Sequence, residues 1–576
     1  MKKKIKSFLY ILMFFTIFAL AFVGCKNPAT DDVDSEVNNP KNQLPKSILS
    51  VPEGDFWNEI TVFISSDIPG VEFYYTKDGS TPTSLSSKYS GKEGIKIDST
   101  TTLKVIATKS DNSIYGVLEA KYTKKSNSIS QENKSGVIFQ GFNWDSAPRG
   151  NGYSEENPNP SWYKWYSIMK KYAKDMQKFE YVWFPPASKT DTNSSEGYAP
   201  TQLNDLNSCY GTEAELKEVI EAIKPAKAIA DIVVNHRAGS TSWGDFTNPK
   251  WDEDYFSICS DDEGFSHSQS PMYGSQNKGN ADSGKGYDAY RDLDHTNTAV
   301  QQGIYSWMNS VLKRVGFMGW RYDYVKGFNG KYVGYYNAMT DAVFSVGEYW
   351  PDDGNWKEQI EKWISDTKTT VNGTAGKQSR AFDFVLKSKL NSAFGWTKAG
   401  DTSQDINWDL SQLDDASTLM RTNPSAAVTF VDNHDTGSTQ QHWELSWYDV
   451  PVAYVYILTH PGMPCVASQH YFSKSDFSTS EKAWQYRGDE NVPNTTNTLK
   501  QHIDYLIQLR QDLGIEYDDT VEVLDATKTN YAAKIVGTKG ELIVKIGGDS
   551  WSPSDTGYSG TAPIYSGKNF AIWVKK

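Results

Sequence analysis

The chain has 576 residues, which at roughly 150 residues per domain predicts several domains and excludes a mini-protein. Its 58 Lys and Arg residues stand against 71 Asp and Glu, and this net charge of −13 argues against nucleic acid or an anionic membrane surface as the main partner. A hydrophobic fraction of 38% excludes a protein with many membrane spans, and an aromatic fraction of 14% favours neutral polar ligands with apolar faces, such as sugars.

Residues 1–25 have the layout of a secretory signal: several lysines, an apolar run and a closing Gly24-Cys25. A small residue before a cysteine resembles the lipobox of bacterial lipoproteins, in which cleavage leaves Cys25 at the N-terminus carrying lipid, although Phe22 stands where that motif usually has Leu. The alternative is an uncleaved anchor helix, since the apolar run is near the lower length for a membrane span. We therefore expect an exported protein at the bacterial cell surface or in the periplasm, attached to a membrane only through this segment, and secreted if no anchor is added.

Residues 26–46 are polar and acidic and predict a flexible tether. From 47 to 123, short alternating strands separated by turn residues predict an N-terminal β-sandwich. The phrase YYTKDGSTPT at 74–83 resembles the immunoglobulin-like module of chitobiases and of many secreted bacterial glycosidases. We favour a spacer over a polysaccharide-binding module, because a sandwich fold alone does not indicate function. Residues 124–135 predict a second linker.

From 136 to 514, apolar strand runs alternate with amphipathic helical stretches, a pattern typical of an α/β fold and specifically of a (β/α)8 TIM barrel. The eight predicted strands lie in VIFQGF, YVWFPPA, AIADIVVNH, FMGWRYDYV, AVFSVGEYW, SRAFDFVL, AAVTFVDNH and VAYVYIL. Residues 237–295, after the third strand, are too many for an ordinary loop and predict a protruding subdomain. Strands without helices over 515–576 predict a C-terminal antiparallel β-sheet domain.

After Cys25 the chain contains only Cys209, Cys259 and Cys465, an odd and sparse set for an exported protein. A disulfide framework is therefore not expected to stabilise the fold. Their spacing leaves open whether Cys209 and Cys259 pair.

Polar side chains end four of the predicted barrel strands. Because the carboxyl ends of barrel strands meet at one mouth, these groups are expected to converge there. Any one of them alone would more often be a structural group, but a cluster from four strand ends predicts an active site. The set contains three carboxylates, two imidazoles and a guanidinium: His236, Arg321, Asp323, Glu348, His434 and Asp435.

These four segments resemble the signature regions of the α-amylase family of retaining glycosidases. The phrases VIFQGFNWDS, WFPPASKT, GYAPTQLNDLNSCYGT, AIADIVVNHRAG, AVTFVDNHDTGSTQ and YILTHPGMPC are similar to the plant-type members, and the resemblance extends over residues 137–576. It implies hydrolysis of internal α-1,4 links in starch-like glucans with retention of configuration. Residues 464–470 depart from the family's more aromatic and acidic phrase, so product length is expected to differ from that of the relatives.

The resemblance also implies catalytic roles. Retaining cleavage needs two carboxyl groups about 5–5.5 Å apart, one as nucleophile and one as proton donor. By the match, Asp323 is the nucleophile, Glu348 the general acid and then base, and Asp435 the carboxylate that stabilises the transition state. Arg321 lies two residues before Asp323, so strand alternation places both side chains on one face, where the cation would keep Asp323 ionised.

Further residues match the substrate-binding positions of the family. His236 and His434 would donate to hydroxyl groups of the sugar at the cleavage site, and Tyr198 would stack on that sugar. The tryptophan would stack on the leaving side, where it would also help to desolvate Glu348. In this sequence the positions are Tyr198, His236, Arg321, Lys326, Trp350 and His434.

Calcium is the cofactor that the resemblance implies. This ion takes six to eight oxygen ligands and can therefore bind a protruding loop onto a barrel. Gly286 stands where the plants carry an acidic residue, so the resemblance implies the principal calcium ion and leaves the number of additional ones open. The matching ligands are the side chains of Asn235, Asp282 and Asp292 and the backbone carbonyls of Lys285 and Gly327.

Two alternatives stay open beside an endo-acting, monomeric α-amylase with an α-glucan as its partner. One is an exo-acting, maltooligosaccharide-forming or transglycosylating relative, because those enzymes share the catalytic residues. The other is a catalytically silent surface protein that only binds glucan, which the intact set of Asp323, Glu348 and Asp435 argues against.

Overall fold

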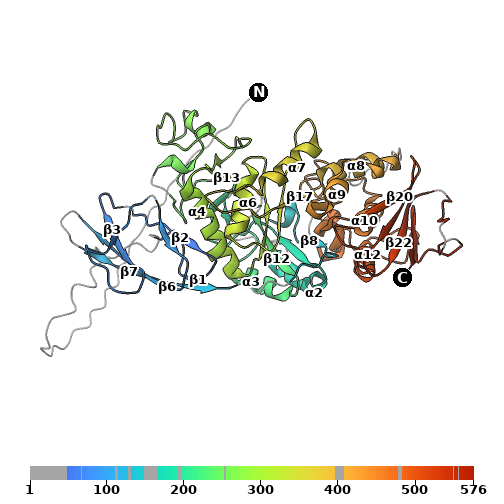
Figure 1. Cartoon of the computed structure of the whole chain (residues 1–576), viewed down its shortest axis with the longest axis horizontal. Coiled ribbons are helices and arrows are strands. Elements are labelled where there is room, and N and C mark those ends of the chain that lie inside the picture. The colour runs from blue at the N-terminus through green and yellow to red at the C-terminus, as the bar shows by residue number, and fades with distance from the viewer. Residues whose placement is uncertain are drawn as a thin grey trace, which may run out of the picture. The chain divides into compact units, whose positions relative to one another are not determined.

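Eight short parallel strands close into the predicted barrel, in the order β12-β15-β16-β17-β18-β19-β8-β9 (Figure 1). The computed structural model describes residues 49–575 except 67, 92, 110–113, 127–130, 148–164, 192–195, 252–253, 396–407, 478–482, 549, 555–556 and 559. The strands are β8 (Ile138–Gln140), β9 (Tyr181–Phe184), β12 (Lys227–Ile232), β15 (Gly319–Tyr322), β16 (Ser345–Gly347), β17 (Arg380–Phe382), β18 (Ala427–Phe430) and β19 (Met463–Ala467).

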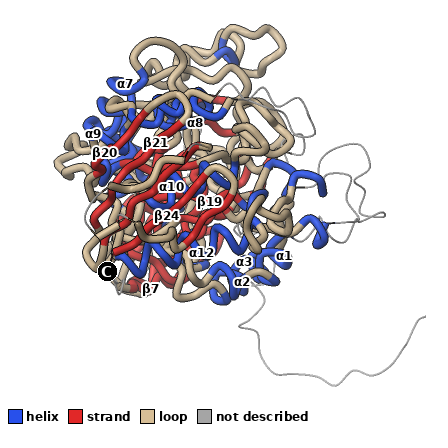
Figure 2. Tube along the Cα trace, turned by 90° about the vertical axis from the view of Figure 1, so that its right-hand side faces the viewer, coloured by secondary structure: helices blue, strands red, loops and turns tan. Residues whose placement is uncertain are grey.

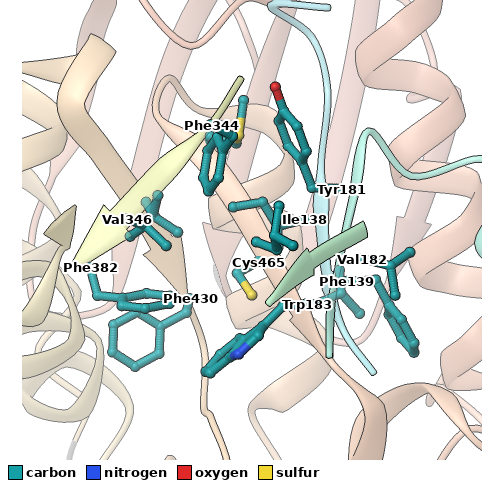
Figure 3. Close-up of a cluster of buried hydrophobic side chains, with 14 of the residues drawn as sticks. Ile138, Phe139, Tyr181, Val182, Trp183, Phe344, Val346, Phe382, Phe430 and Cys465 are labelled. Atoms are coloured by element: carbon teal, nitrogen blue, oxygen red, sulfur yellow. The ribbon is translucent and has the colours of Figure 1, made fainter. Parts of the chain in front are cut away.

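Apolar side chains from these strands fill the middle of the barrel, as Figure 3 shows. The rings of Phe382 and Phe430, from neighbouring strands, meet edge to face with their centroids 5.6 Å apart. Trp183 packs on Phe382 at the same distance of 5.6 Å. A filled interior excludes a pore and leaves chemistry to the strand ends.

The eighth strand differs from the prediction. The run VAYVYIL lies inside a helix, α10 (Val450–Thr459), and the eighth strand is β19, which carries the sequence MPCVA. All ten residues of α10 are buried, so the run shows no amphipathic period. A short, wholly buried apolar run does not distinguish strand from helix, which explains the error.

Helices surround the barrel. The predicted helix after the subdomain places Val300, Ile304 and Val311 in the core and contains a π-helical turn at Met308–Leu312. Thr212 and Glu215 form a capping box at the start of another. The remaining bounds are α1 (Trp165–Lys171), α2 (Ala173–Met176), α3 (Glu213–Ala222), α4 (Thr298–Trp307), α5 (Lys313–Val315), α6 (Gly330–Met339), α7 (Trp356–Asp366), α8 (Phe384–Phe394), α9 (Leu419–Thr422), α11 (Ser468–Tyr471) and α12 (Leu499–Leu513).

The subdomain begins and ends at one small antiparallel ladder, β13 (His236–Arg237) with β14 (Arg291–Asp292). Its register pairs His236 with Asp292, which brings the end of β12 against the end of the subdomain. Arg237 is fully buried and donates to the backbone oxygens of Thr201 and Pro249. A second ladder, β10 (Lys189–Thr190) with β11 (Pro200–Gln202), lies in the segment after β9.

The N-terminal module has a five-stranded sheet and a two-stranded sheet around its own core. It contacts α4 directly: the backbone N–H of Thr61 donates to Ser306 Oγ at 2.7 Å. Later in the chain, Glu132 forms a bidentate ion pair with Arg380 of β17. The strands are β1 (Gly54–Trp57), β2 (Ile60–Val62), β3 (Glu72–Thr76), β4 (Ser87–Lys88), β5 (Ile95–Ile97), β6 (Thr101–Thr108) and β7 (Ile114–Lys125).

The C-terminal domain is the predicted antiparallel sheet, with strand order β20-β21-β22-β24-β23 (Figure 2). Helix α12 ends at Gly514, whose φ of +62° is the left-handed conformation that favours glycine. The strands are β20 (Val521–Ala526), β21 (Asn530–Val536), β22 (Glu541–Gly547), β23 (Tyr565–Gly567) and β24 (Phe570–Lys575).

The predicted signal, its Cys25 and the tether lie outside the described residues. No helix in the described part of the chain is long and apolar enough to cross a membrane. Cys209, Cys259 and Cys465 are all free thiols, so the open question of a Cys209–Cys259 pair is answered against a disulfide.

Candidate active site

A cleft of about 260 Å³ opens at the carboxyl ends of the barrel strands. Seven of the nine residues predicted for catalysis or substrate binding line it, together with four that were not predicted. The lining residues are Trp144, Tyr198, His236, Tyr287, Asp323, Tyr324, Glu348, Trp350, His434, Asp435 and His442.

Arg321 is fully buried beneath this cleft and contacts three carboxyl groups. Its Nη1 lies 2.7 Å from Asp323 Oδ1 and 2.9 Å from Asp231 Oδ1. Its Nη2 lies 2.9 Å from Glu348 Oε2. One cation thus holds the predicted nucleophile and the predicted acid side by side, which confirms the predicted contact between Arg321 and Asp323.

Burial governs the protonation of the two carboxyl groups. It raises the pKa of Asp323, whereas the Arg321 guanidinium and a hydrogen bond with Glu348 lower that pKa. Burial also raises the pKa of Glu348, and there the hydrogen bond with Asp323 adds to the rise. The hydrogen bond between the two groups thus lowers the pKa of Asp323 and raises that of Glu348, which favours Asp323 as the ionised partner of the pair.

A third and a fourth carboxyl group share the same cation. Burial, followed by the charge of Glu348, raises the pKa of Asp435 well above its usual range. Burial raises the pKa of Asp231 to about 7, against the opposing effect of Arg321. Four buried carboxyl groups around one guanidinium cannot all be ionised together, so the site holds protons at neutral pH.

A hydrogen-bond chain fixes the ring of His434. Gln140 Nε2 lies 2.8 Å from His434 Nδ1, and Tyr198 Oη lies 2.8 Å from Nε2. Tyr198 in turn donates to Asp231 Oδ2 at 3.0 Å. Burial, with Arg321 nearby, lowers the pKa of His434 well below its usual range, so the imidazole is neutral. With Gln140 Nε2 donating to Nδ1, the ring proton is on Nε2, which donates to Tyr198 Oη.

Flat rings line the walls. Trp144, Tyr198 and His434 are nearly parallel, with interplanar angles of 5–12°. Trp350 also lines the cleft and stacks on Phe384 with centroids 5.0 Å apart. Such faces suit the apolar faces of pyranose rings.

Besides the buried Arg321, Lys326 is the predicted substrate-binding residue that does not line the cleft. Its Nζ lies 2.8 Å from Asp352 Oδ1, and Lys285 Nζ pairs with the other oxygen of the same carboxylate at 2.6 Å. Lys326 thus takes part in an ion pair, and its contact with substrate stays a prediction.

The predicted calcium ligands come together between the subdomain and the barrel. Asn235 Nδ2 donates to Asp292 Oδ1 at 3.1 Å, and a Cβ at Gly327 would lie only 1.9 Å from Asn235 Oδ1, so no other residue fits there. Asp282 Oδ2 is buried without a hydrogen-bond partner. Burial, with Asp282 nearby, raises the pKa of Asp292 to about 8. These are features of carboxylates that lack a cation.

Among the described residues, no three His, Cys, Asp or Glu side chains gather as they would around a metal ion. The predicted set contains only two carboxylates, Asp282 and Asp292, and otherwise an amide and two backbone carbonyls, which are oxygen ligands that calcium accepts. The residues present therefore fit this ion.

Comparison with known families decides the assignment. Residues 168–474 match the family described as "Alpha amylase, catalytic domain". The chain belongs to the α-amylase family. Its residues 512–574 match the α-amylase C-terminal β-sheet domain, and residues 51–114 match the chitobiase/β-hexosaminidase C-terminal domain, which confirms both flanking modules.

Relatives of this family member span plants and bacteria. A probable α-amylase of Arabidopsis thaliana is 32% identical, over 76% of this chain and 94% of its own length. A glucan 1,4-α-maltotetraohydrolase of Stutzerimonas stutzeri is 25% identical, over 78% of this chain and 75% of its own. The crystal structure of a cyclomaltodextrin glucanotransferase shares the fold with a TM-score of 0.52 at 15% identity, covering 77% of this chain and 99% of that one.

Sequence reasoning on this α-amylase family member missed several cleft residues. Asp231, which contacts Arg321 beneath the cleft, is the fourth residue of the run AIADI, and an acid inside an apolar strand was a usable signal. Trp144, in the quoted phrase FNWDS, was another. Tyr287, Tyr324 and His442 lie in irregular segments, whose side-chain directions a sequence pattern does not give.

Proposed function

We propose that this chain is an exported α-amylase that hydrolyses internal α-1,4-glucosidic bonds of starch, glycogen or maltooligosaccharides with retention. The observation that carries the proposal is the hydrogen-bonded pair of Asp323 and Glu348, joined by Arg321 at the base of an aromatic cleft. A short separation of the two carboxyl groups is typical of retaining glycosidases, whereas inverting enzymes leave room for a water molecule between them.

Double displacement follows from the two protonation states. Glu348 donates its proton to the departing glucosidic oxygen as Asp323 attacks the anomeric carbon, so the C–O bond breaks and a glucosyl ester forms on Asp323. Glu348, now ionised, takes a proton from water, whose oxygen displaces Asp323. The enzyme returns to its starting state with one bond hydrolysed.

The remaining groups act on the sugar at the cleavage site. Asp435 lies beside His434, with Oδ2 3.2 Å from Nε2, and both border the cleft. Hydrogen bonds from these groups to sugar hydroxyls, with Tyr198 stacked beneath the ring, would stabilise the positively charged transition state.

Endo action is supported by space beyond the catalytic centre. Tyr287 and Tyr290 stack on His236 with centroids 4.4 and 5.8 Å away. Tyr290 also lines a second cavity of about 320 Å³, bordered by Asp191 and Trp243. A glucan is thus able to continue past the cleavage site instead of ending there. Exo action is the second candidate, because the relatives include maltotetraohydrolases.

Incubation of the full chain with soluble starch tests the proposal, with iodine colour and new reducing ends followed together. Endo cleavage predicts that the iodine colour disappears while few new reducing ends have formed, and that the products are a mixture of lengths. Slow colour loss with one dominant short product would establish the exo-acting alternative. Tight glucan binding without turnover would establish a binding protein.

We also propose one calcium ion, held by Asn235, Asp282 and Asp292 with the carbonyls of Lys285 and Gly327. When bound it would tie the subdomain to the barrel, because Asp282 and Asp292 belong to the subdomain and Asn235 and Gly327 follow barrel strands. The cleft walls on the His236 side would then be held in place.

Calcium removal is expected to destabilise the fold. At calcium 100-fold above Kd, a chelator should remove about 2.7 kcal/mol of stability, measured as a lower Tm. Asn235→Ala should lower Tm and shrink this chelator effect. Asn337→Ala is the matched control: Asn337 is buried and bonded to Tyr322 and Lys377, so Tm should fall with the chelator effect intact. An equal chelator effect in wild type and Asn235→Ala would contradict the site.

The pH profile of kcat/KM should be bell-shaped. Glu348 must be protonated at the start of the reaction, and its raised pKa keeps it protonated to higher pH. Activity is lost as the pH rises through that pKa. Asp323 must be ionised, so activity is lost as pH falls through its pKa. A profile flat on the alkaline side would contradict the role of Glu348 as the acid.

We also propose that the protein is anchored to a membrane through Cys25, because residues 1–25 have the layout of a lipoprotein signal. Cys25→Ser should abolish incorporation of labelled palmitate and release the enzyme into the medium or periplasm. Labelling that persists in this variant would contradict lipidation at Cys25.

A further inference from the structure

A buried ion pair lies behind the cleft, outside its lining. Lys387 Nζ of α8 is 2.7 Å from Asp432 Oδ1, in the segment after β18, and their side chains are 0% and 2% exposed. His470 Nε2 lies 3.9 Å from the other oxygen of Asp432, but burial, with Arg487 and Lys387 nearby, lowers the pKa of His470 well below its usual range. At neutral pH the imidazole is therefore uncharged, and Lys387 is the cation in contact with this carboxylate.

The pair holds the loop that carries His434 and Asp435. Thr436 Oγ1 donates to Asp432 Oδ1 at 3.1 Å and accepts from the backbone N–H of Asn433 at 3.0 Å. Asn433 Oδ1 then accepts the backbone N–H groups of Asp435 and Thr436, at 2.9 and 2.8 Å. The backbone of Asp435 is thus fixed through a closed set of bonds that begins at Asp432.

The same carboxylate also holds the aromatic wall of the leaving side. Both oxygens of Asp432 accept from the backbone N–H of Leu445, at 3.2 and 3.3 Å. Two residues earlier, the Trp443 N–H donates to Thr436 O at 3.0 Å. The Trp443 ring stacks on Trp350, with centroids 6.2 Å apart at an angle of 22°. Lys387 Nζ lies 5.6 Å from the centre of the Trp443 ring.

We propose that the Lys387–Asp432 pair is a positioning element of the active site, which sets the loop of His434 and Asp435 and the Trp443–Trp350 wall relative to each other. The inference rests on the proposed function. A buried ion pair contributes little net stability compared with a well-packed apolar pair, whereas its directed bonds fix geometry. Here those bonds run to the two walls between which the glucan is cleaved.

Lys387→Met and Asp432→Asn test this on maltoheptaose, assayed well below the Tm of each variant. Misplacement of Asp435 by about 1 Å should lower kcat about 10²-fold, with a smaller change in KM, because the lost contacts act in the transition state. The lengths of the products should shift as well, because the leaving-side wall is released. A merely structural pair would lower Tm and leave both kcat and product lengths unchanged.

Lys227→Met is the matched control. Lys227 pairs with Glu180 at the start of β12, at the other end of the barrel, and both side chains are only 12% exposed. This variant should have a lower Tm and an unchanged kcat. If Lys387→Met does not fold, the double variant Lys387→Met with Asp432→Asn removes both charges, is expected to fold, and should show the same deficit in kcat.

The outcomes separate the two claims. A wild-type chain without turnover on any α-glucan overturns the proposed function and this inference together. Wild-type turnover with kcat and product lengths preserved in the Lys387 and double variants overturns the inference alone.

Discussion

Glu348→Gln is expected to lower kcat on starch by about 10⁴-fold, because the amide has no proton that it can give to the departing oxygen. Asp323→Asn should be as severe, since it removes the nucleophile. Glutamine has nearly the size of glutamate, and Arg321 keeps its contacts with Asp323 and Asp231. Tm and the Kd for maltoheptaose should therefore change little.

Glu132→Gln serves as the control for these two variants. Glu132 is also engaged by an arginine, Arg380 of β17, at the end of the barrel opposite to the cleft. The Glu132→Gln variant should therefore have the kcat of the wild type. Turnover near the wild-type level in Glu348→Gln would exclude Glu348 as the general acid.

Arg321→Lys carries the second large effect. A lysine ammonium is a single point charge and cannot reach three carboxyl groups in the fixed geometry of a guanidinium. We expect kcat to fall about 10²-fold, because Asp323 and Glu348 lose their common support. The acidic limb of the pH profile should move to higher pH, because the cation that opposes the effect of burial on the Asp323 pKa is weakened.

Arg510→Lys separates this effect from a general loss of buried arginine. Arg510 is fully buried in α12 and donates to the backbone oxygens of His460 and Gly462, with no contact to the cleft. Its replacement should lower Tm while leaving kcat and the pH profile in place. Equal pH profiles for Arg321→Lys and wild type would contradict the proposed electrostatic role.

The barrel and the convergence of its catalytic groups could be predicted from sequence because topology fixes both. Parallel strands that alternate with helices must place their carboxyl ends at one mouth, so the sequence alone predicts that Asp323, Glu348 and Asp435 converge there. The eighth strand could not be predicted in the same way. The run in α10 is buried on all sides, and only packing decides whether such a segment is helix or strand.

Contacts between distant segments were the other limit. Arg321 was expected to face Asp323, two residues away, but its contact with Asp231 crosses from β15 to β12. The ion pair of Lys326 with Asp352, which joins the segment after β15 to the segment after β16, is a second contact that the sequence pattern did not predict. Patterns within one strand can be read locally, and pairings across strands need the three-dimensional register.

The stereochemistry of the first product tests the account most directly. Proton NMR of the full chain acting on a maltooligosaccharide distinguishes the α and β anomers at the new reducing end before they equilibrate. Double displacement through Asp323, with Glu348 as acid and then base, predicts that the α anomer appears first. Initial release of the β anomer would contradict the assignment of Asp323 as a nucleophile and of the chain as a retaining glycosidase.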